Sequence, residues 1–93
     1  MDPEKRKAVI LEKMVRRRQW GMSYRPVEET VSSVPNRFRK EARQDLEELI
    51  RDSWMERHKN GACVSLNSSR KDEIRSFLEE HGDLEQWLLE TLF

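Results

Sequence analysis

The residues best suited to chemistry lie directly after Pro35, where cationic and amide side chains recur at helical spacing. They are Arg37, Arg39, Lys40, Arg43 and Gln44. Arg can pair bidentately with guanine and Gln with adenine, so Arg37, Lys40 and Gln44 suit the reading of base edges in DNA. Arg39 and Arg43 fit phosphate contacts better. The alternative is a solvated helix face on which these cations pair with neighbouring glutamates.

Two further groups of cations suit phosphate. Arg57 and Lys59 precede an Asn60–Gly61 pair, which is typical of a hairpin turn. At a hairpin tip they could bind phosphate or only keep the exposed strand edge soluble. The densest basic run is Arg16–Arg18. It suits either a flanking phosphate or the carbonyl end of a helix dipole.

Motifs for catalysis are missing from the sequence. It has no glycine-rich phosphate loop, no Gly-x-Ser-x-Gly elbow and no His-Glu-x-x-His zinc motif. His58 and Cys63 would face each other across the expected hairpin, where they could form a thiolate nucleophile or half of a zinc site. Such facing residues are far more often a packing pair. We therefore expect no enzymatic activity, no metal and no other cofactor.

The charge of the chain is divided between its two halves. Residues 1–43 contain 12 Lys and Arg against 6 Asp and Glu, whereas residues 44–93 contain 6 against 12, so +6 balances −6. This asymmetry favours one side that faces a polyanion, although two solvated faces would give the same pattern. Cys63 is the only cysteine, which favours an intracellular protein, cytoplasmic or, in a eukaryote, nuclear. No apolar run approaches the roughly 18–20 residues of a membrane span.

Three helices are expected in the first half. The first begins at Asp2 and Pro3, with Gly21 as its left-handed terminator. The second begins at Pro26 and carries a valine stripe: Val27, Val31 and Val34. The third begins at Asn36, its expected cap, and turns an apolar stripe inward. That stripe is Phe38, Ala42, Leu46, Leu49 and Ile50, so the side chains pointing outward are Arg37, Lys40, Gln44, Glu47 and Arg51.

The second half predicts a hairpin and two more helices. A two-residue turn on Asn60 and Gly61 would pair Lys59 with Ala62, His58 with Cys63, Arg57 with Val64 and Met55 with Leu66. The inner face would carry Met55, Ala62, Val64 and Leu66, and the outer face Glu56, His58, Cys63 and Ser65. A fourth helix is expected from a Ser69–Asp72 capping box to His81 and Gly82, and a last helix over residues 84–93.

This order of elements, with three residues between Val34 and Phe38, resembles the winged helix-turn-helix family. The resemblance covers roughly residues 5–67. It is clearest from Leu46 to Leu66, where spaced leucines precede a strand, a turn and a second strand. The pattern is similar to small archaeal and bacterial members of that family. It implies a mainly α fold with a small β-hairpin wing, in which the N-terminal part of the third helix contacts base edges in the major groove.

We therefore expect a winged-helix domain over residues 1–82 and an apolar C-terminal helix over residues 83–93. Six of the last ten residues are large and apolar. This segment either docks on the first helix or forms a homodimer interface through Leu84, Trp87, Leu88 and Leu92. The expected function is non-catalytic binding of double-stranded DNA by a transcription regulator. The alternatives are a protein-interaction or dimerisation module on the same scaffold, and RNA binding.

Overall fold

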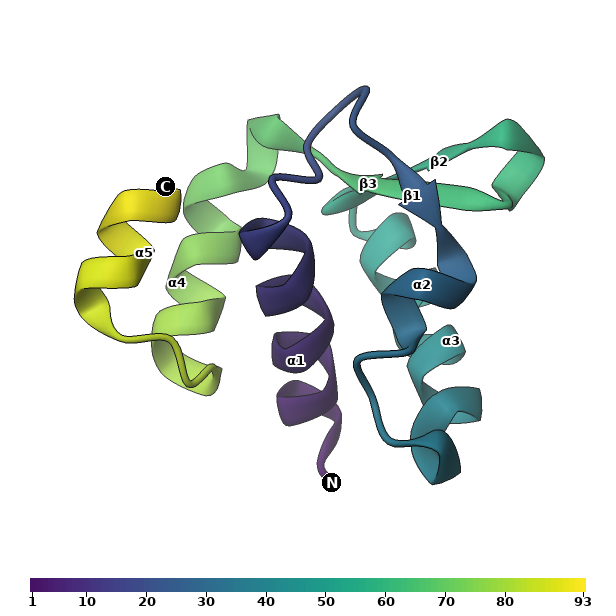
Figure 1. The fold of residues 1–93 in the computed structure, drawn as a ribbon, viewed down its shortest axis with the longest axis horizontal. Coiled ribbons are helices and arrows are strands. Elements are labelled where there is room, and N and C mark those ends of the chain that lie inside the picture. Colours follow the sequence, from purple (N-terminus) through teal and green to yellow (C-terminus); the bar gives the residue numbers. More distant parts are fainter.

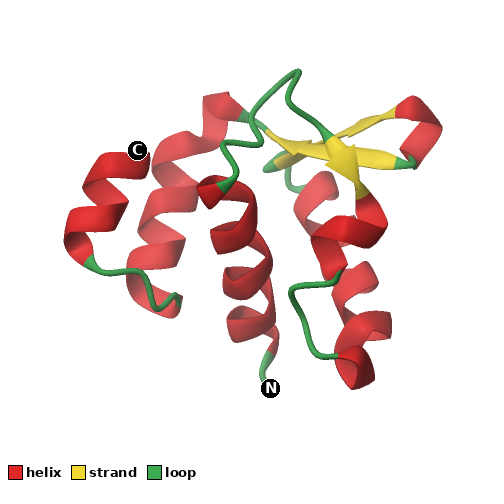
Figure 2. Ribbon diagram, in the orientation of Figure 1, coloured by secondary structure: helices red, strands yellow, loops and turns green.

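Five α-helices and a small three-stranded antiparallel sheet make up the fold (Figure 1, Figure 2). The structure is a computed structural model, and it describes every residue from 1 to 93. The helices are α1 (Pro3–Arg16), α2 (Val27–Val31), α3 (Arg39–Arg51), α4 (Lys71–His81) and α5 (Gln86–Leu92). The strands are β1 (Arg25–Pro26), β2 (Met55–His58) and β3 (Cys63–Leu66). None of the helices combines the length and the apolar character that a membrane-spanning segment requires.

Helix α1 runs through the centre of the molecule, with α4 on one side and α2 and α3 on the other (Figure 1). The Asp2 carboxylate accepts a hydrogen bond of 2.8 Å from the backbone N–H of Lys5, which confirms the predicted cap. The helix ends before Gly21, because Arg18 itself adopts a left-handed φ of 52°. The basic run Arg16–Arg18 therefore extends past the end of the helix into the turn that follows.

Helices α2 and α3 are joined by the seven residues 32–38, which end in a 3-10 turn over Asn36–Phe38. The expected three-residue connection after Val34 is therefore wrong, because α2 already ends at Val31. Val31 and Val34 are buried beneath this connection, as the valine stripe predicted. Asn36 was expected to cap the third helix, and this prediction is wrong. No side chain caps the turn, and the Asn36 side-chain oxygen accepts a hydrogen bond of 3.3 Å from the Arg39 guanidinium.

The hairpin has the predicted register, with Met55 opposite Leu66 and His58 opposite Cys63. Its turn also lies on Asn60 and Gly61, which both have positive φ, 56° and 90°. Lys59 departs from the prediction, because its φ of 53° takes it out of the strand. The expected Lys59–Ala62 strand pair is therefore wrong, and Ala62 is exposed where the inner face was predicted.

Strand β1 was not predicted. It pairs with β3, so the order is β1-β3-β2 and β3 lies in the middle of the sheet. On the same edge of β3, the backbone N–H of Leu66 donates to the Gln19 carbonyl at 2.7 Å. Ser65, expected on an outer face, is fully buried by these neighbours. A two-residue strand containing Pro26 has too little alternation to be recognised in the sequence.

Helices α4 and α5 form the opposite end of the molecule from α3 (Figure 1). The predicted Ser69–Asp72 capping box is wrong, because the Asn67 side chain accepts a hydrogen bond of 3.1 Å from the Ser69 N–H instead. The final helix begins at Gln86 rather than at Leu84. It packs on α4, with Leu89 buried and the Phe93 ring meeting Trp20 edge-on at 5.8 Å.

A buried ion pair ties α1 to α3 next to the apolar core. The Arg6 guanidinium donates two hydrogen bonds to Asp45, from Nε to Oδ2 at 2.7 Å and from Nη2 to Oδ1 at 3.1 Å. The Asp45 side chain is 2% exposed. Its hydrogen bond to Arg6 raises the pKa of the guanidinium above the ordinary value. The pair fixes the position of α3 beside α1.

Candidate nucleic-acid interface

The N-terminal end of α3 presents unneutralised positive charge. Arg37, Lys40 and Gln44 are all exposed, as predicted. The ion pairs of α3 involve Arg43, Asp45, Glu47, Glu48 and Arg51, so Arg37 and Lys40 have no carboxylate partner. The Arg37 guanidinium lies 4.9 Å from the centre of the Phe38 ring. This contact orients the side chain and leaves its N–H groups free for an acceptor.

Arg39 has a different place from the one expected. Its side chain is half-buried, and Nε donates to the Val34 carbonyl at 3.2 Å while Nη1 donates to Asn36. It therefore holds the connection between α2 and α3 together. Only its remaining N–H groups are available to a phosphate.

Arg43 and Arg57 are each paired with a glutamate. Arg43 Nη2 donates to Glu28 of α2 at 2.7 Å, and Arg57 Nη2 donates to Glu47 of α3. The four side chains are 47–73% exposed. Ion pairs this exposed contribute about 0–1 kcal/mol. Both arginines can therefore exchange a glutamate for a phosphate oxygen at little cost.

The two ion pairs stand at the rim of a cleft of about 440 Å³ between α2, α3 and the hairpin. Its other lining includes Leu46 and Val64, which are almost fully buried, and Gly61 at the hairpin turn. The cleft brings the hairpin tip next to the C-terminal half of α3. The structure thus places Arg43 and Arg57 at one site, as two phosphate contacts to the same strand would require.

The hairpin tip contacts the ring of Tyr24, which precedes α2. The Lys59 ammonium lies 5.9 Å from the centre of the Tyr24 ring, and His58 stacks on that ring at 4.4 Å. His58 Nε2 is 2.8 Å from the hydroxyl of Ser65. Although His58 and Cys63 are opposite in register, the imidazole is thus engaged with Tyr24 and Ser65. No group of three or more His, Cys, Asp or Glu is arranged to hold a metal ion.

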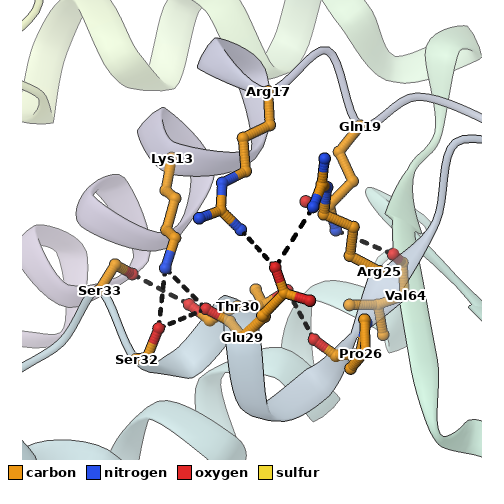
Figure 3. A network of polar contacts seen from close by, with 10 residues as sticks. All are labelled: Lys13, Arg17, Gln19, Arg25, Pro26, Glu29, Thr30, Ser32, Ser33 and Val64. Atoms are coloured by element: carbon orange, nitrogen blue, oxygen red, sulfur yellow. Dashed lines mark hydrogen bonds and ion pairs between the residues drawn. The ribbon is translucent and has the colours of Figure 1, made fainter.

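A second basic group surrounds one carboxylate where α1 ends (Figure 3). Glu29 Oε1 accepts hydrogen bonds from Arg17 at 3.0 Å and from Arg25 at 3.3 Å. Lys13 Nζ donates to the Glu29 carbonyl at 2.7 Å and to the Ser32 hydroxyl at 2.8 Å. Two cations thus share the Glu29 carboxylate, and Lys13 binds the backbone of the same residue, so the group as a whole is positive.

The pKa of Lys13 is lowered first by burial and then by the neighbouring cations. Burial lowers it from the ordinary value, the Arg17 guanidinium lowers it further, and Glu29 opposes both. Arg39 also lowers it, so the start of α3 and the end of α1 share one electrostatic environment. An anion bound here would relieve the repulsion between these cations.

A shallow groove of about 430 Å³ lies beside this group, and Arg16, Arg17 and Ser33 line it. Arg16 is exposed and forms no ion pair, whereas Arg17 is tied to Glu29. Arg18 turns out of the helix and does not line the groove. Of the basic run, Arg16 is therefore the residue best placed to contact a flanking phosphate.

Two acidic residues were overlooked in the sequence. Asp45 falls three residues after Ala42 and next to Leu46, on the inward stripe of its helix, and an acid at such a position signals a buried partner. Glu29 gave no comparable signal, because its partners come from α1 and β1. Only tertiary contacts bring them together.

Comparison of the chain with protein-family models, with curated proteins and with solved structures found no significant match. The candidate interface therefore stands on its own residues and geometry.

Proposed function

We propose that this chain is a winged helix-turn-helix protein that binds double-stranded DNA without catalysis and regulates transcription. Two features of the fold support the winged helix-turn-helix part of this proposal. Helices α2 and α3 follow each other in the chain and pack together, as the two helices of a helix-turn-helix motif do, although the seven residues 32–38 between them exceed the roughly three to four of a typical motif. The β2–β3 hairpin follows α3 directly and stands beside its C-terminal half, where a wing would lie.

The observation that carries the proposal is the free positive charge at the N-terminal end of α3. Arg37 and Lys40 are exposed and lack acidic partners, and Gln44 lies one turn further along the same face. In helix-turn-helix proteins the N-terminal residues of the second helix of the motif contact base edges in the major groove. These three side chains would make the base contacts.

Phosphate contacts would come from residues further along α3, from the hairpin and from α1. Arg43, Arg57 and Lys59 lie on the hairpin side, beside the C-terminal half of α3, and Arg16 lies on the α1 side. Glu47 and Glu48 follow on α3 and would repel phosphates deeper in the groove. The base contacts would therefore be confined to the beginning of α3, while the hairpin would hold the phosphate backbone near its C-terminal half.

A salt titration of DNA binding tests the proposal. Fluorescence anisotropy with a labelled 20-base-pair duplex should show an affinity that falls steeply as salt rises. The double variant Arg37→Ala/Lys40→Ala should bind about 100-fold more weakly, since contacts of this kind are each worth roughly 1–3 kcal/mol. Duplex RNA of the same sequence should compete poorly.

The matched control is Arg70→Ala/Arg75→Ala, which removes the same amount of charge at two arginines that pair with glutamates of α4. It should weaken binding by less than about threefold. Equal losses in the two double variants would mean that net charge alone drives binding. No duplex binding at low salt would refute DNA binding altogether.

A further inference from the structure

Helix α5 presents a large aromatic side chain to solvent. Trp87 is 61% exposed, whereas Trp20 and Trp54 pack against the core. Leu84 and Leu88, which are close to it in the sequence, are half-buried. Tryptophan is enriched among the residues that anchor protein–protein interfaces.

The sequence segment around Trp87 is acidic. Residues 76–93 contain five acidic residues and no Lys or Arg. Asp83 is paired with Lys5 of α1, and Glu79 is paired with Arg75. The carboxylates of Glu85 and Glu90 form no ion pair and are exposed.

Glu85 is held against the tryptophan itself. Its Oε2 accepts a hydrogen bond of 2.6 Å from the indole Nε1. Glu90 follows Trp87 by three residues on α5, so the two side chains are neighbours on the helix surface. The indole face and two carboxylates therefore form one exposed patch that suits cations, because an ammonium or guanidinium group is attracted to both.

We propose that the α5 patch, defined as Leu84, Glu85, Trp87, Leu88 and Glu90, binds a basic amphipathic helix of a protein partner. Charge complementarity selects this occupant: a Lys- and Arg-rich segment would place its cations on the carboxylates and the indole. Its apolar stripe would cover Trp87 and the half-buried leucines, as amphipathic helices do in apolar grooves.

The patch lies far from the proposed DNA interface. Helix α5 is at one end of the longest dimension of 34 Å, and α3 with the hairpin is at the other (Figure 1). The protein could then hold DNA and a basic partner at the same time. The inference does not depend on DNA binding, and each can fail without the other.

NMR titration of the full chain with a 14-residue Leu/Lys amphipathic peptide tests the proposal. Saturable shifts should be confined to residues 83–93, and a Leu/Glu peptide should cause none. Trp87→Ala should weaken the peptide affinity about tenfold, since both the cation contact and the covered area are lost. The matched control is Met22→Ala, which removes another exposed apolar side chain, 82% exposed, from a different part of the molecule. It should leave the affinity unchanged.

Two double variants test whether the carboxylates of the α5 patch itself, rather than the negative charge of the whole protein, attract the peptide. Glu85→Gln/Glu90→Gln should weaken the peptide affinity about fivefold or more, while Asp52→Asn/Glu56→Gln, with the same change in charge, should change it less than twofold. Equal effects of the two pairs, or shifts spread over the whole chain, would overturn the proposal. A concentration-dependent dimer in sedimentation velocity that Trp87→Ala abolishes would also overturn it, since the occupant would then be a second copy joined through the residues expected for a homodimer.

Discussion

The buried pair between Arg6 and Asp45 offers a sharp test of how α3 is held in place. The Asp45 side chain is 2% exposed and the Arg6 side chain 11%. In Asp45→Ala the guanidinium would keep its charge but lose both hydrogen bonds. Removing one partner of a buried pair costs about 3–5 kcal/mol. Such a loss is a large part of the roughly 5–15 kcal/mol that stabilises a typical domain.

Because the charge of Glu41 acts on Arg6, we expect the loss of stability in Asp45→Ala to be at the lower end of that range. One of the Glu41 carboxylate oxygens is buried without a hydrogen-bond partner, and its charge helps to raise the pKa of Arg6. When Asp45 is removed, Glu41 remains as a carboxylate whose charge acts on the guanidinium. We therefore expect Asp45→Ala to lose about 3 kcal/mol, which corresponds to a fall in Tm of about 12 °C or more for a chain of this size.

Urea unfolding followed by tryptophan fluorescence would measure the loss. The control is Lys5→Ala, which breaks the ion pair with Asp83, whose side chain is 78% exposed. It should cost less than about 1 kcal/mol. The apolar double variant Arg6→Met/Asp45→Leu should recover most of the stability lost in Asp45→Ala, because neither residue then leaves an unpaired buried charge. Equal losses in Asp45→Ala and Lys5→Ala would refute the view that burial makes the Asp45 pair important.

Two further predictions concern charges near the interface. Glu47→Gln should raise the affinity for duplex DNA about two- to fivefold in an anisotropy titration, because it frees Arg57 and removes a negative charge; an unchanged or weaker affinity would contradict this. The pKa of Lys13, measured by NMR at Nζ, should move back toward its ordinary value of 10.5 in Arg17→Ala. The folded chain binds this proton less tightly than the unfolded chain, so stability should rise with pH from the folded pKa up to about 10.5. A lysine pKa that Arg17→Ala leaves in place would refute the electrostatic link.

The parts of the fold that the sequence predicts correctly are those set by local pattern. The Asn60–Gly61 pair and the alternation around it fix the register of the hairpin, because a turn of that type allows one register. Asp2 ahead of Pro3 locates the start of α1 for an equally local reason. The stripe of α3 buries Ala42 and Leu46 as periodicity requires.

The errors come where two local signals compete or where the partner is distant. Asn67 caps the start of the fourth helical segment in place of Ser69, and both are good cap residues. Strand β1 exists because Arg25 and Pro26 meet β3, which lies nearly forty residues away in the sequence. No short window of sequence contains that information.

The candidate interface was predictable in its residue types but not in its charge. The helical pattern placed Arg37, Lys40 and Gln44 on the exposed face correctly. It could not show that Arg43 and Arg57 are already neutralised, because their glutamates lie on α2 and α3 and reach them only in the folded chain. Nor could it show that Arg39 hydrogen-bonds to the connection between α2 and α3.

The positions of the unpaired cations decide where a polyanion would bind, more than the net charge of residues 1–43 does. Arg43 and Arg57 add no net charge while their glutamates remain in place, so the first attraction must come from Arg37 and Lys40. Once phosphate is close, each exposed pair can open at a cost of about 0–1 kcal/mol. The arginine then gains a phosphate, and the glutamate turns to water. Binding should therefore release fewer counterions than the number of basic residues suggests, and Glu47→Gln should steepen the dependence of affinity on salt, because Arg57 would then carry counterions before DNA arrives.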